Sequence, residues 1–313
     1  MAESPRVSFC ATDLNTVGRL KESIESVETL GKIVGAPFEI VVAEGPSTDG
    51  STEALRSLCG SRPFLKVVTH QQKNRGYGRR LAFEASSGQT IVPFDTSLSY
   101  SPDYGDLLRR YLALSTPRML FSEVCALSRE SILKVGGWRD LIGGEDLDLY
   151  ARIIVAVGVL AYPTGLRGSQ SARMSSFARQ MRYERGSWIR QLRRIYEVQR
   201  DQIIGGNYRV EDLMDFNRRK SWARRVSLRV FFTLAYWGSR RSAIRPFQTD
   251  RNNYLVLRDA LLESLDRRDY LELHWAGHEP RLPLTEDEVG YLSQRSRRWH
   301  ELGTTVDRYV VPK

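Results

Sequence analysis

Residues 38–51, FEIVVAEGPSTDGS, combine a continuous apolar run with a polar turn. The run at 38–43 is long enough for a strand that is buried on both faces, as strands of parallel sheets are. Ser47, Thr48 and Asp49 then supply turn and capping side chains, which predicts a helix over 52–58. The stretch therefore predicts one strand and one helix of a repeating β/α unit.

The same alternation extends in both directions along the chain. Upstream, residues 6–11 are rich in strand-forming residues, and apolar positions spaced by three and four predict a helix over 16–34. Downstream, we expect a strand at 64–69, a helix near 76–86 and a strand at 90–94. This order predicts an α/β fold with a mostly parallel sheet flanked by helices.

The composition narrows the class of protein. With 313 residues, 41% of them hydrophobic, the chain can bury a core, which excludes a disordered or collagen-like protein. Three cysteines without paired spacing imply no disulfide framework. The start of the sequence does not resemble a signal peptide, and no window offers ~18 consecutive apolar residues. We therefore expect a cytoplasmic protein.

Basic residues are concentrated in one central stretch. Residues 167–245 contain 19 Lys and Arg against 6 Asp and Glu, whereas the segments on either side are close to neutral. This asymmetry indicates an anionic partner such as phosphate, nucleic acid or a membrane surface, and the alternative is a solvated basic face. No nucleic-acid recognition motif accompanies the stretch, so we expect no nucleic-acid partner.

Acidic residues stand at the ends of three predicted strands. Thr12 and Asp13 follow the first strand, Glu44 follows the second, and Asp95 follows the strand at 90–94. Ligands of open α/β sheets bind outside the carboxyl ends of the strands. Acids at one edge repel each other unless they meet donors or cations, which a base, a ribose and a metal-bound diphosphate supply. The sequence therefore favours a nucleotide site over separate capping turns.

A second acidic segment, GGEDLDLY at 143–150, places two glycines before the start of a helix. Acids in a first helical turn are stabilised by the helix dipole, which is a sufficient structural explanation for Glu145, Asp146 and Asp148. A catalytic explanation depends on the rest of the chain.

Five segments carry a family resemblance by their order and approximate spacing. They are residues 7–15 (VSFCATDLN), 39–51 (EIVVAEGPSTDGS), 74–88 (NRGYGRRLAFEASSG), 91–104 (IVPFDTSLSYSPDY) and 135–152 (VGGWRDLIGGEDLDLYAR). Over roughly residues 6–190 the chain resembles the inverting family 2 glycosyltransferases of the GT-A fold. The resemblance implies transfer of a sugar from a nucleoside-diphosphate sugar, most commonly a UDP-sugar, to a hydroxyl or phosphate on a glycan or a lipid-linked acceptor.

The resemblance also implies roles for individual residues. Those matching the nucleotide-binding positions are Thr12, Asp13, Glu44, Lys73, Asn74 and Arg79. Asp95 matches the first acid of the metal-binding DxD motif, whose second acid is Ser97 here. The resemblance thus implies Mg²⁺ or Mn²⁺ at Asp95, and Lys or Arg side chains replacing part of the metal charge are the alternative.

For catalysis, the resemblance implies that Asp146, paired with Glu145, removes the proton from the attacking acceptor hydroxyl. Arg182 falls in a segment similar to the QxxRW motif of processive relatives, where an arginine offsets diphosphate charge. A surface helix is the alternative for that segment. A non-catalytic GT-A-like protein that binds a nucleotide sugar or an anionic polymer is the rival function, which Ser97 favours.

We expect three regions: a GT-A domain at 1–175, a basic helical acceptor or membrane-proximal region at 176–245, and a helical tail at 246–313 with a helix over 252–266. The apolar run at 226–238 is too short to span a bilayer, whose core is ~30 Å thick. It predicts either an interfacial helix with peripheral contact on the inner face of the membrane, or a helix buried in the core or in a dimer contact.

Overall fold

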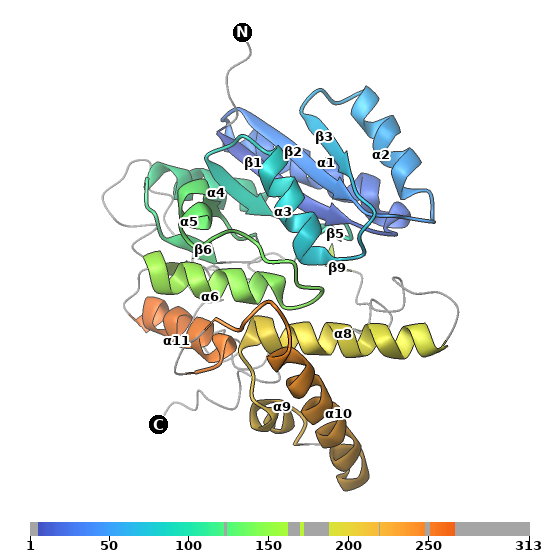
Figure 1. Ribbon diagram of the computed structural model, residues 1–313. Helices are drawn as coiled ribbons and strands as arrows, with labels where there is room; N and C mark the ends of the chain where they lie inside the picture. Colours follow the sequence, from blue (N-terminus) through green and yellow to red (C-terminus); the bar gives the residue numbers. More distant parts are fainter. Residues whose placement is uncertain are drawn as a thin grey trace.

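The computed structural model describes residues 6–121, 124–161, 170–171, 188–218, 220–247 and 251–266. Its centre is a sheet in the order β3-β2-β1-β4-β7. The strands are β1 (Val7–Asp13), β2 (Phe38–Glu44), β3 (Leu65–Thr69), β4 (Thr90–Pro93) and β7 (Leu127–Ser128). The first four run parallel, and β7 pairs antiparallel with β4. The predicted α/β class with a mostly parallel, helix-flanked sheet is confirmed (Figure 1).

Alternate residues of the central strands enter two separate cores. Phe9 and Ala11 of β1 belong to a cluster with α1 (Val17–Val34), α2 (Ser51–Gly60) and α4 (Asp103–Ala113). Cys10, between them, belongs to the opposite cluster with α3 (Arg75–Ala85), α5 (Arg129–Lys134) and α6 (Glu145–Val157). The continuous apolar runs of the sequence follow from this arrangement, because both faces of the sheet are covered.

The predicted boundaries need one correction that matters for function. Asp13 and Glu44 are the last residues of β1 and β2 and pair in register, whereas the sequence placed them beyond the strands. The parallel ladder continues past them because the Gly45 N–H donates to the Asp13 carbonyl at 2.9 Å. Both acids are therefore held by strand geometry instead of by a turn.

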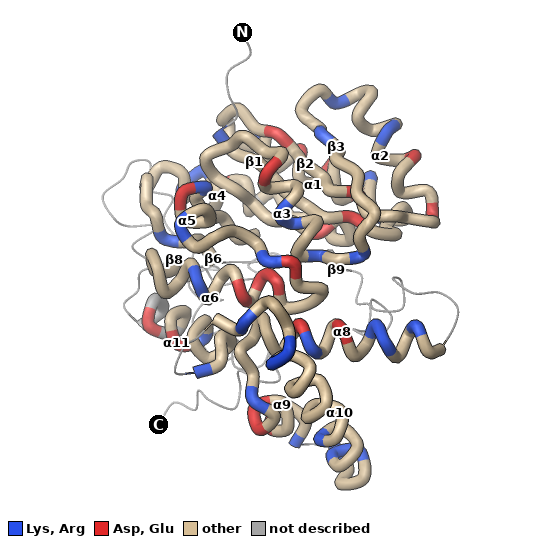
Figure 2. Tube along the Cα trace, viewed as in Figure 1, with Lys and Arg blue, Asp and Glu red and all other residues tan. Residues whose placement is uncertain are grey.

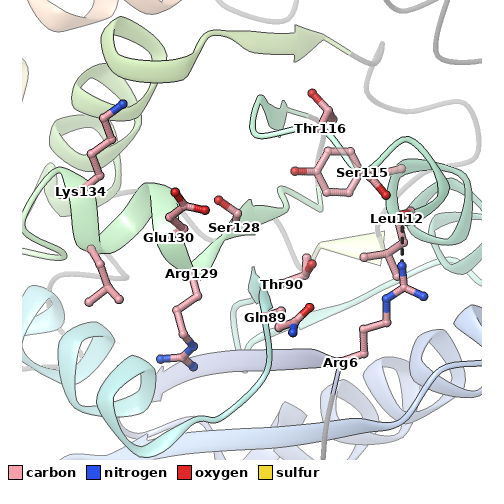
Figure 3. Close-up of a pocket in the computed structure, with 12 residues that line it drawn as sticks. Arg6, Gln89, Thr90, Leu112, Ser115, Thr116, Ser128, Arg129, Glu130 and Lys134 are labelled. Atoms are coloured by element: carbon pink, nitrogen blue, oxygen red, sulfur yellow. Dashed lines mark hydrogen bonds between the residues drawn. The ribbon is translucent and has the colours of Figure 1, made fainter.

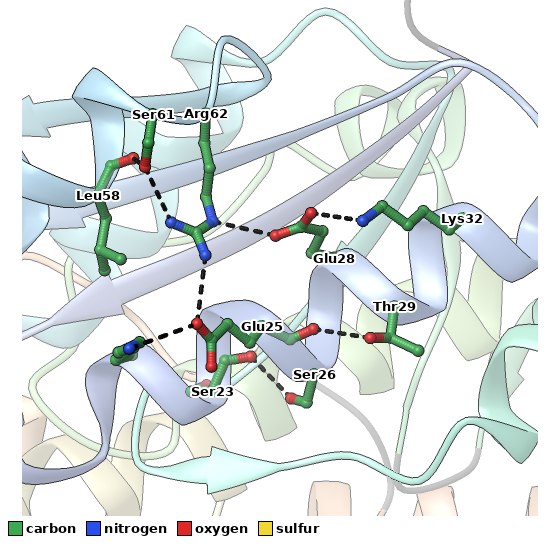
Figure 4. Close-up of polar contacts among 10 residues, drawn as sticks. Ser23, Glu25, Ser26, Glu28, Thr29, Lys32, Leu58, Ser61 and Arg62 are labelled. Atoms are coloured by element: carbon green, nitrogen blue, oxygen red, sulfur yellow. Dashed lines mark hydrogen bonds and ion pairs between the residues drawn. The ribbon is translucent and has the colours of Figure 1, made fainter.

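Polar contacts hold α2 against α1. Arg62, just after α2, donates from Nε to Glu28 Oε2 at 3.0 Å and from Nη2 to Glu25 Oε1 at 3.3 Å (Figure 4). Glu28 also accepts from Lys32 at 2.7 Å. These contacts join α1 to the end of α2 and do not involve the acids at the carboxyl ends of the strands.

The C-terminal part of the described chain is helical, as predicted. It comprises α8 (Trp188–Gly206), α9 (Val210–Phe216), α10 (Trp222–Arg240) and α11 (Asn253–Asp266). Ile203, Leu213, Phe232 and Ala235 form a small core among α8, α9 and α10. By contrast, α11 packs against α6 and β8 (Val159–Ala161), and its Leu261 joins the core of the sheet domain.

Short strands complete the fold around the sheet. β5 (Leu98–Ser99) pairs with β9 (Gln170–Ser171), and β6 (Met119–Phe121) pairs with β8. Within the described residues, every helix is too short or too polar to cross a bilayer.

Candidate active site

The carboxyl edge of the sheet brings three of the predicted acids together. Asp13 and Glu44 are neighbours across the β1–β2 pair. Thr96, which follows Asp95 at the end of β4, donates from Oγ1 to Asp13 Oδ1 at 2.5 Å. Parallel strands 1, 2 and 4 are adjacent in the sheet order, so residues that end them share one edge.

Asp13 and Glu44 form a buried carboxyl pair. Each is 1% exposed, and Glu44 Oε1 accepts from Thr52 Oγ1 at 2.9 Å. Burial, and then the adjacent Asp13, raise the pKa of Glu44 to about 8. Asp13 Oδ2 and Glu44 Oε2 meet no hydrogen-bond donor among the described residues. A proton on Glu44 would supply the donor that these two oxygens lack. Glu44 is therefore the member of the pair that holds a proton at neutral pH.

Nine residues line a small hollow at the ends of β1 and β3. Among them are His70 and four residues predicted as nucleotide contacts, which are Thr12, Asp13, Lys73 and Asn74. The hollow measures about 20 Å³, which is room for a single water molecule. A nucleobase is much larger, so the hollow in this form does not hold one.

His70 is a site residue that the sequence reasoning missed. It follows β3 directly, is 8% exposed, and accepts at Nδ1 from the Gln72 N–H at 3.3 Å. Burial lowers its pKa, so the ring is neutral with its proton on Nε2. Nε2 has no hydrogen-bond partner among the described residues. Inspecting the residue after the predicted strand at 64–69, as was done for the other strands, would have found it.

Gly78 allows α3 to approach this hollow closely. A Cβ at this position would lie 2.0 Å from Thr12 Oγ1 and 3.3 Å from His70 Nε2. Any larger residue would therefore displace the end of β1 or the His70 ring.

Asp146 lies in the first turn of α6 among basic and indole groups. Trp138 Nε1 donates to its Oδ1 at 3.0 Å, and Arg79 Nη2 lies 3.4 Å from its Oδ2. Arg75 Nη2 is 4.0 Å from the same oxygen. Burial opposes ionisation of this carboxyl, but Arg79, Arg75 and the Trp138 hydrogen bond outweigh it and hold the pKa of Asp146 below its usual value. The side chain is therefore a carboxylate at neutral pH.

Glu145 is the protonatable partner of Asp146. It is 2% exposed, and its Oε1 forms an ion pair with Arg75 Nη2 at 3.0 Å. Burial and the adjacent Asp146 raise the pKa of Glu145 to about 7, while Arg75 and Arg79 oppose the rise. The helix can begin at Glu145 because Gly144 has a φ of 77°, a left-handed conformation that glycine adopts without strain.

Arg79 connects the two acidic regions. Its buried guanidinium donates from Nη1 to the Phe94 carbonyl at 2.6 Å and to the Cys10 carbonyl at 3.4 Å. Phe94 immediately precedes Asp95, so one guanidinium links the end of β4 to Asp146. The predicted nucleotide residue Arg79 and the predicted base Asp146 are thus direct neighbours.

Asp95 offers one carboxylate to a cation. Its Oδ1 accepts from the Ser97 N–H at 3.3 Å and the Ser97 hydroxyl at 3.1 Å. Among the described residues, no three His, Cys, Asp or Glu side chains converge as a ligand set. One carboxylate and one hydroxyl fit Mg²⁺ or Mn²⁺ only when diphosphate oxygens and water complete the coordination.

Two conspicuous polar residues of the motifs serve the local structure. Asp148 is fully buried and forms ion pairs with Arg139 and Arg152. Asn74 accepts from the Tyr77 N–H at 3.1 Å as the N-cap of α3, and donates to the Asp140 carbonyl at 2.9 Å. Both sets of contacts fix the loop at 135–141 beside Asp146. The predicted diphosphate residue Arg182 lies outside the described residues.

A much larger hollow, of about 810 Å³, lies at the opposite end of the sheet. Its lining includes Arg6 and Thr90, at the starts of β1 and β4. Figure 3 shows the Arg129 side chain turned away from Glu130 and Ser128. The Arg129 guanidinium instead donates to the Gly88 carbonyl at 2.8 Å and to Ser86 Oγ at 2.6 Å. The larger of the two hollows is therefore not the one that is lined by the predicted site residues.

One protein-family model matches the first third of the chain. Residues 14–113 match the model described as glycosyl transferase family 2. The matched stretch begins just after Asp13 and contains Glu44, His70, Arg79 and Asp95. This match indicates that the chain is a glycosyltransferase.

Solved structures of glycosyltransferases are similar to the chain at low identity. A mannosyltransferase from Pyrobaculum calidifontis, in complex with GDP-Man and Mn²⁺, is 14% identical over 98% of this chain and 85% of its own, with a TM-score of 0.49. S. aureus TarS 1-349, in complex with UDP-GlcNAc, is 12% identical over 86% of this chain and 81% of its own, with a TM-score of 0.47. No curated protein sequence matches the chain.

Proposed function

We propose that this protein is an inverting glycosyltransferase that moves a sugar from a nucleoside-diphosphate sugar to a hydroxyl or phosphate acceptor. The observation that carries the proposal is the arrangement of Asp146, Arg79 and the end of β4. An ionised carboxylate lies 3.4 Å from a buried guanidinium, which also bonds the residue before Asp95. Such a site has a proton acceptor on one side and positive charge for a leaving diphosphate on the other.

In the proposed reaction, Asp146 removes the proton from the acceptor hydroxyl. The acceptor oxygen forms a bond to the anomeric carbon while the bond from that carbon to the diphosphate oxygen breaks. A single displacement from the face opposite the leaving group inverts the anomeric configuration. General-base catalysis of this kind contributes typically ~10²–10⁴-fold to the rate.

The arginines also regulate when Asp146 can act as a base. Without donor, Arg79 and Arg75 hold the pKa of Asp146 low, which makes it a weak proton acceptor. A diphosphate anion competes for the same guanidiniums, because charge-assisted bonds to phosphate oxygens are favourable. Loss of the arginine contacts raises the basicity of Asp146, so donor binding prepares the base.

Asp95 and the Ser97 hydroxyl are the residues that would hold Mg²⁺ or Mn²⁺ together with the donor diphosphate. The cation would supply positive charge to the leaving diphosphate. At the base end, His70 Nε2 and the Asp13–Glu44 pair offer both a donor and acceptors to a nucleobase or ribose. The resembled family favours a UDP-sugar donor and a glycan or lipid-linked acceptor.

The test measures nucleoside diphosphate released from a panel of UDP- and GDP-sugars, with and without Mn²⁺. We expect one donor to be hydrolysed slowly without acceptor, and Asp146→Asn to abolish the release. An inverted anomeric configuration in the product, measured by NMR, is the expected stereochemical result. A donor that raises the melting temperature but is never cleaved would favour the non-catalytic sugar-nucleotide binder instead.

A further inference from the structure

Apolar side chains that face solvent are concentrated on two helices. Eleven large hydrophobic residues are exposed within the described part of the chain, and eight of them lie on α8 and α10. Those on α10 are Trp222, Val226, Val230, Leu234 and Trp237, with exposed fractions from 48% to 79%. An exposed apolar surface of this size on one element indicates an interaction site.

These five side chains form one stripe along α10. They are spaced by four, four, four and three residues, and at about 100° per residue they occupy one face of the helix. We name this face the Trp222–Trp237 stripe. The face that packs on α8 and α9 carries Phe232, Ala235 and Ser239 instead, on roughly the opposite side of the helix. The stripe is therefore separate from the side of α10 that packs into the small helical core.

The charge of α10 is entirely positive. The helix contains Arg224, Arg225, Arg229 and Arg240 and no acidic residue over its 19 positions. At about 100° per residue, Arg225, Arg229 and Arg240 lie along one edge of the stripe and Arg224 lies beyond the other. Figure 2 shows Lys and Arg recurring along α8 and α10. Tryptophans at both ends of the stripe suit the headgroup zone of a bilayer, where amphipathic rings are enriched.

We propose that the Trp222–Trp237 stripe of α10 binds the surface of an anionic phospholipid membrane, with the helix lying in the plane of the interface. The apolar side chains enter the acyl boundary, and the flanking arginines contact lipid phosphates. Charge complementarity selects this occupant over a neutral apolar partner. The proposal concerns α10 alone and is independent of sugar transfer.

The experiment is flotation of the full-length protein with vesicles of phosphatidylcholine alone or mixed with phosphatidylglycerol. We expect binding to the anionic vesicles only, with a marked loss at high salt because exposed charges are screened. Trp222→Gln/Trp237→Gln should reduce partitioning about tenfold or more, and Arg225→Glu/Arg229→Glu should remove the preference for anionic lipid. Leu133→Gln/Val155→Gln is the matched control, since these side chains are equally exposed on α5 and α6.

A spectroscopic arm identifies the inserted side chains. Brominated phospholipid should quench tryptophan fluorescence of the wild-type protein, and Trp222→Phe/Trp237→Phe should bind vesicles but lose most of that quenching. Binding that is unchanged in the glutamine double variant would overturn the proposal. So would protection of Trp222 and Trp237 from acrylamide without lipid, or a dimer that the glutamine variant dissociates, because either result shows that protein covers the stripe.

Discussion

Two carboxyl pairs of the candidate site differ in the groups that surround them. Asp13 and Glu44 are buried with hydroxyl groups around them, and Glu44 becomes protonated with a pKa raised to about 8. Glu145 is buried and Asp146 is partly buried, and Arg79 and Arg75 lie beside them; the pKa of Asp146 falls, although burial raises that of Glu145 to about 7. Burial favours the neutral form in both places, and the nearby guanidinium groups keep Asp146 ionised. In the proposed reaction, the charged Asp146 pair accepts the proton and the protonated Asp13–Glu44 pair contacts the nucleotide.

The largest effect is expected at the charged pair, from Asp146→Asn. Transfer should fall by about 10²–10⁴-fold, because the asparagine cannot accept the proton. Nucleoside diphosphate affinity, measured by calorimetry, should not fall, since Arg79 and Arg75 lose a competing anion. Asp140→Asn is a control, because Asp140 lies in the loop before α6 and pairs with Arg80 of α3. Full transfer activity in Asp146→Asn would exclude Asp146 as the base.

A neighbouring acid on the same helix should respond in stability instead. Asp148 is fully buried between Arg139 and Arg152, and breaking a buried ion pair typically costs about 3–5 kcal/mol. Asp148→Asn should therefore lower the free energy of unfolding, measured with urea, far more than Asp146→Asn does. Equal destabilisation by the two variants would show that Asp148 contributes no more to stability than Asp146 does.

The protonated pair should make stability depend on pH. The folded pKa of Glu44 is about 8 against an ordinary value of 4.5, so the native state binds the extra proton. The contribution of Glu44 is complete below pH 4.5 and is lost as the pH rises towards 8. In urea unfolding, the wild-type protein should have a higher free energy of unfolding at pH 5 than at pH 8. Glu44→Gln should make this difference between the two pH values smaller, because glutamine does not titrate. An unchanged difference would show that Glu44 is ionised in the native state.

The smallest effect is expected from His70→Phe, which keeps a ring but removes the Nε2–H donor. Nucleotide affinity should fall about two- to tenfold, the size of one hydrogen bond, with little change in the rate at saturating donor. Gln72→Ala is the control, because Gln72 contacts the ring through its backbone N–H. Unchanged affinity would place the nucleobase away from His70.

Much of the fold was accessible from local patterns. The strand at 38–43 and the helix over 16–34 follow from hydrophobic periodicity, and the structure has both within a few residues. The gathering of Asp13, Glu44 and Asp95 followed from a topological rule about strand ends. The pairing of Arg79 with Asp146 did not, because α3 and α6 are 60 residues apart in sequence and their contact depends on how both pack on the sheet.

The residue types and their order determined that this chain has a helix-flanked parallel sheet with acids at its carboxyl edge, since periodicity and strand ends are local properties. Tertiary packing alone decided that Asp146 is charged while Glu44 is protonated, and that α10 presents a second apolar face to solvent. Protonation depends on which cations share a buried site, and exposure depends on which neighbours a helix acquires. Neither property is encoded by any single stretch of the chain.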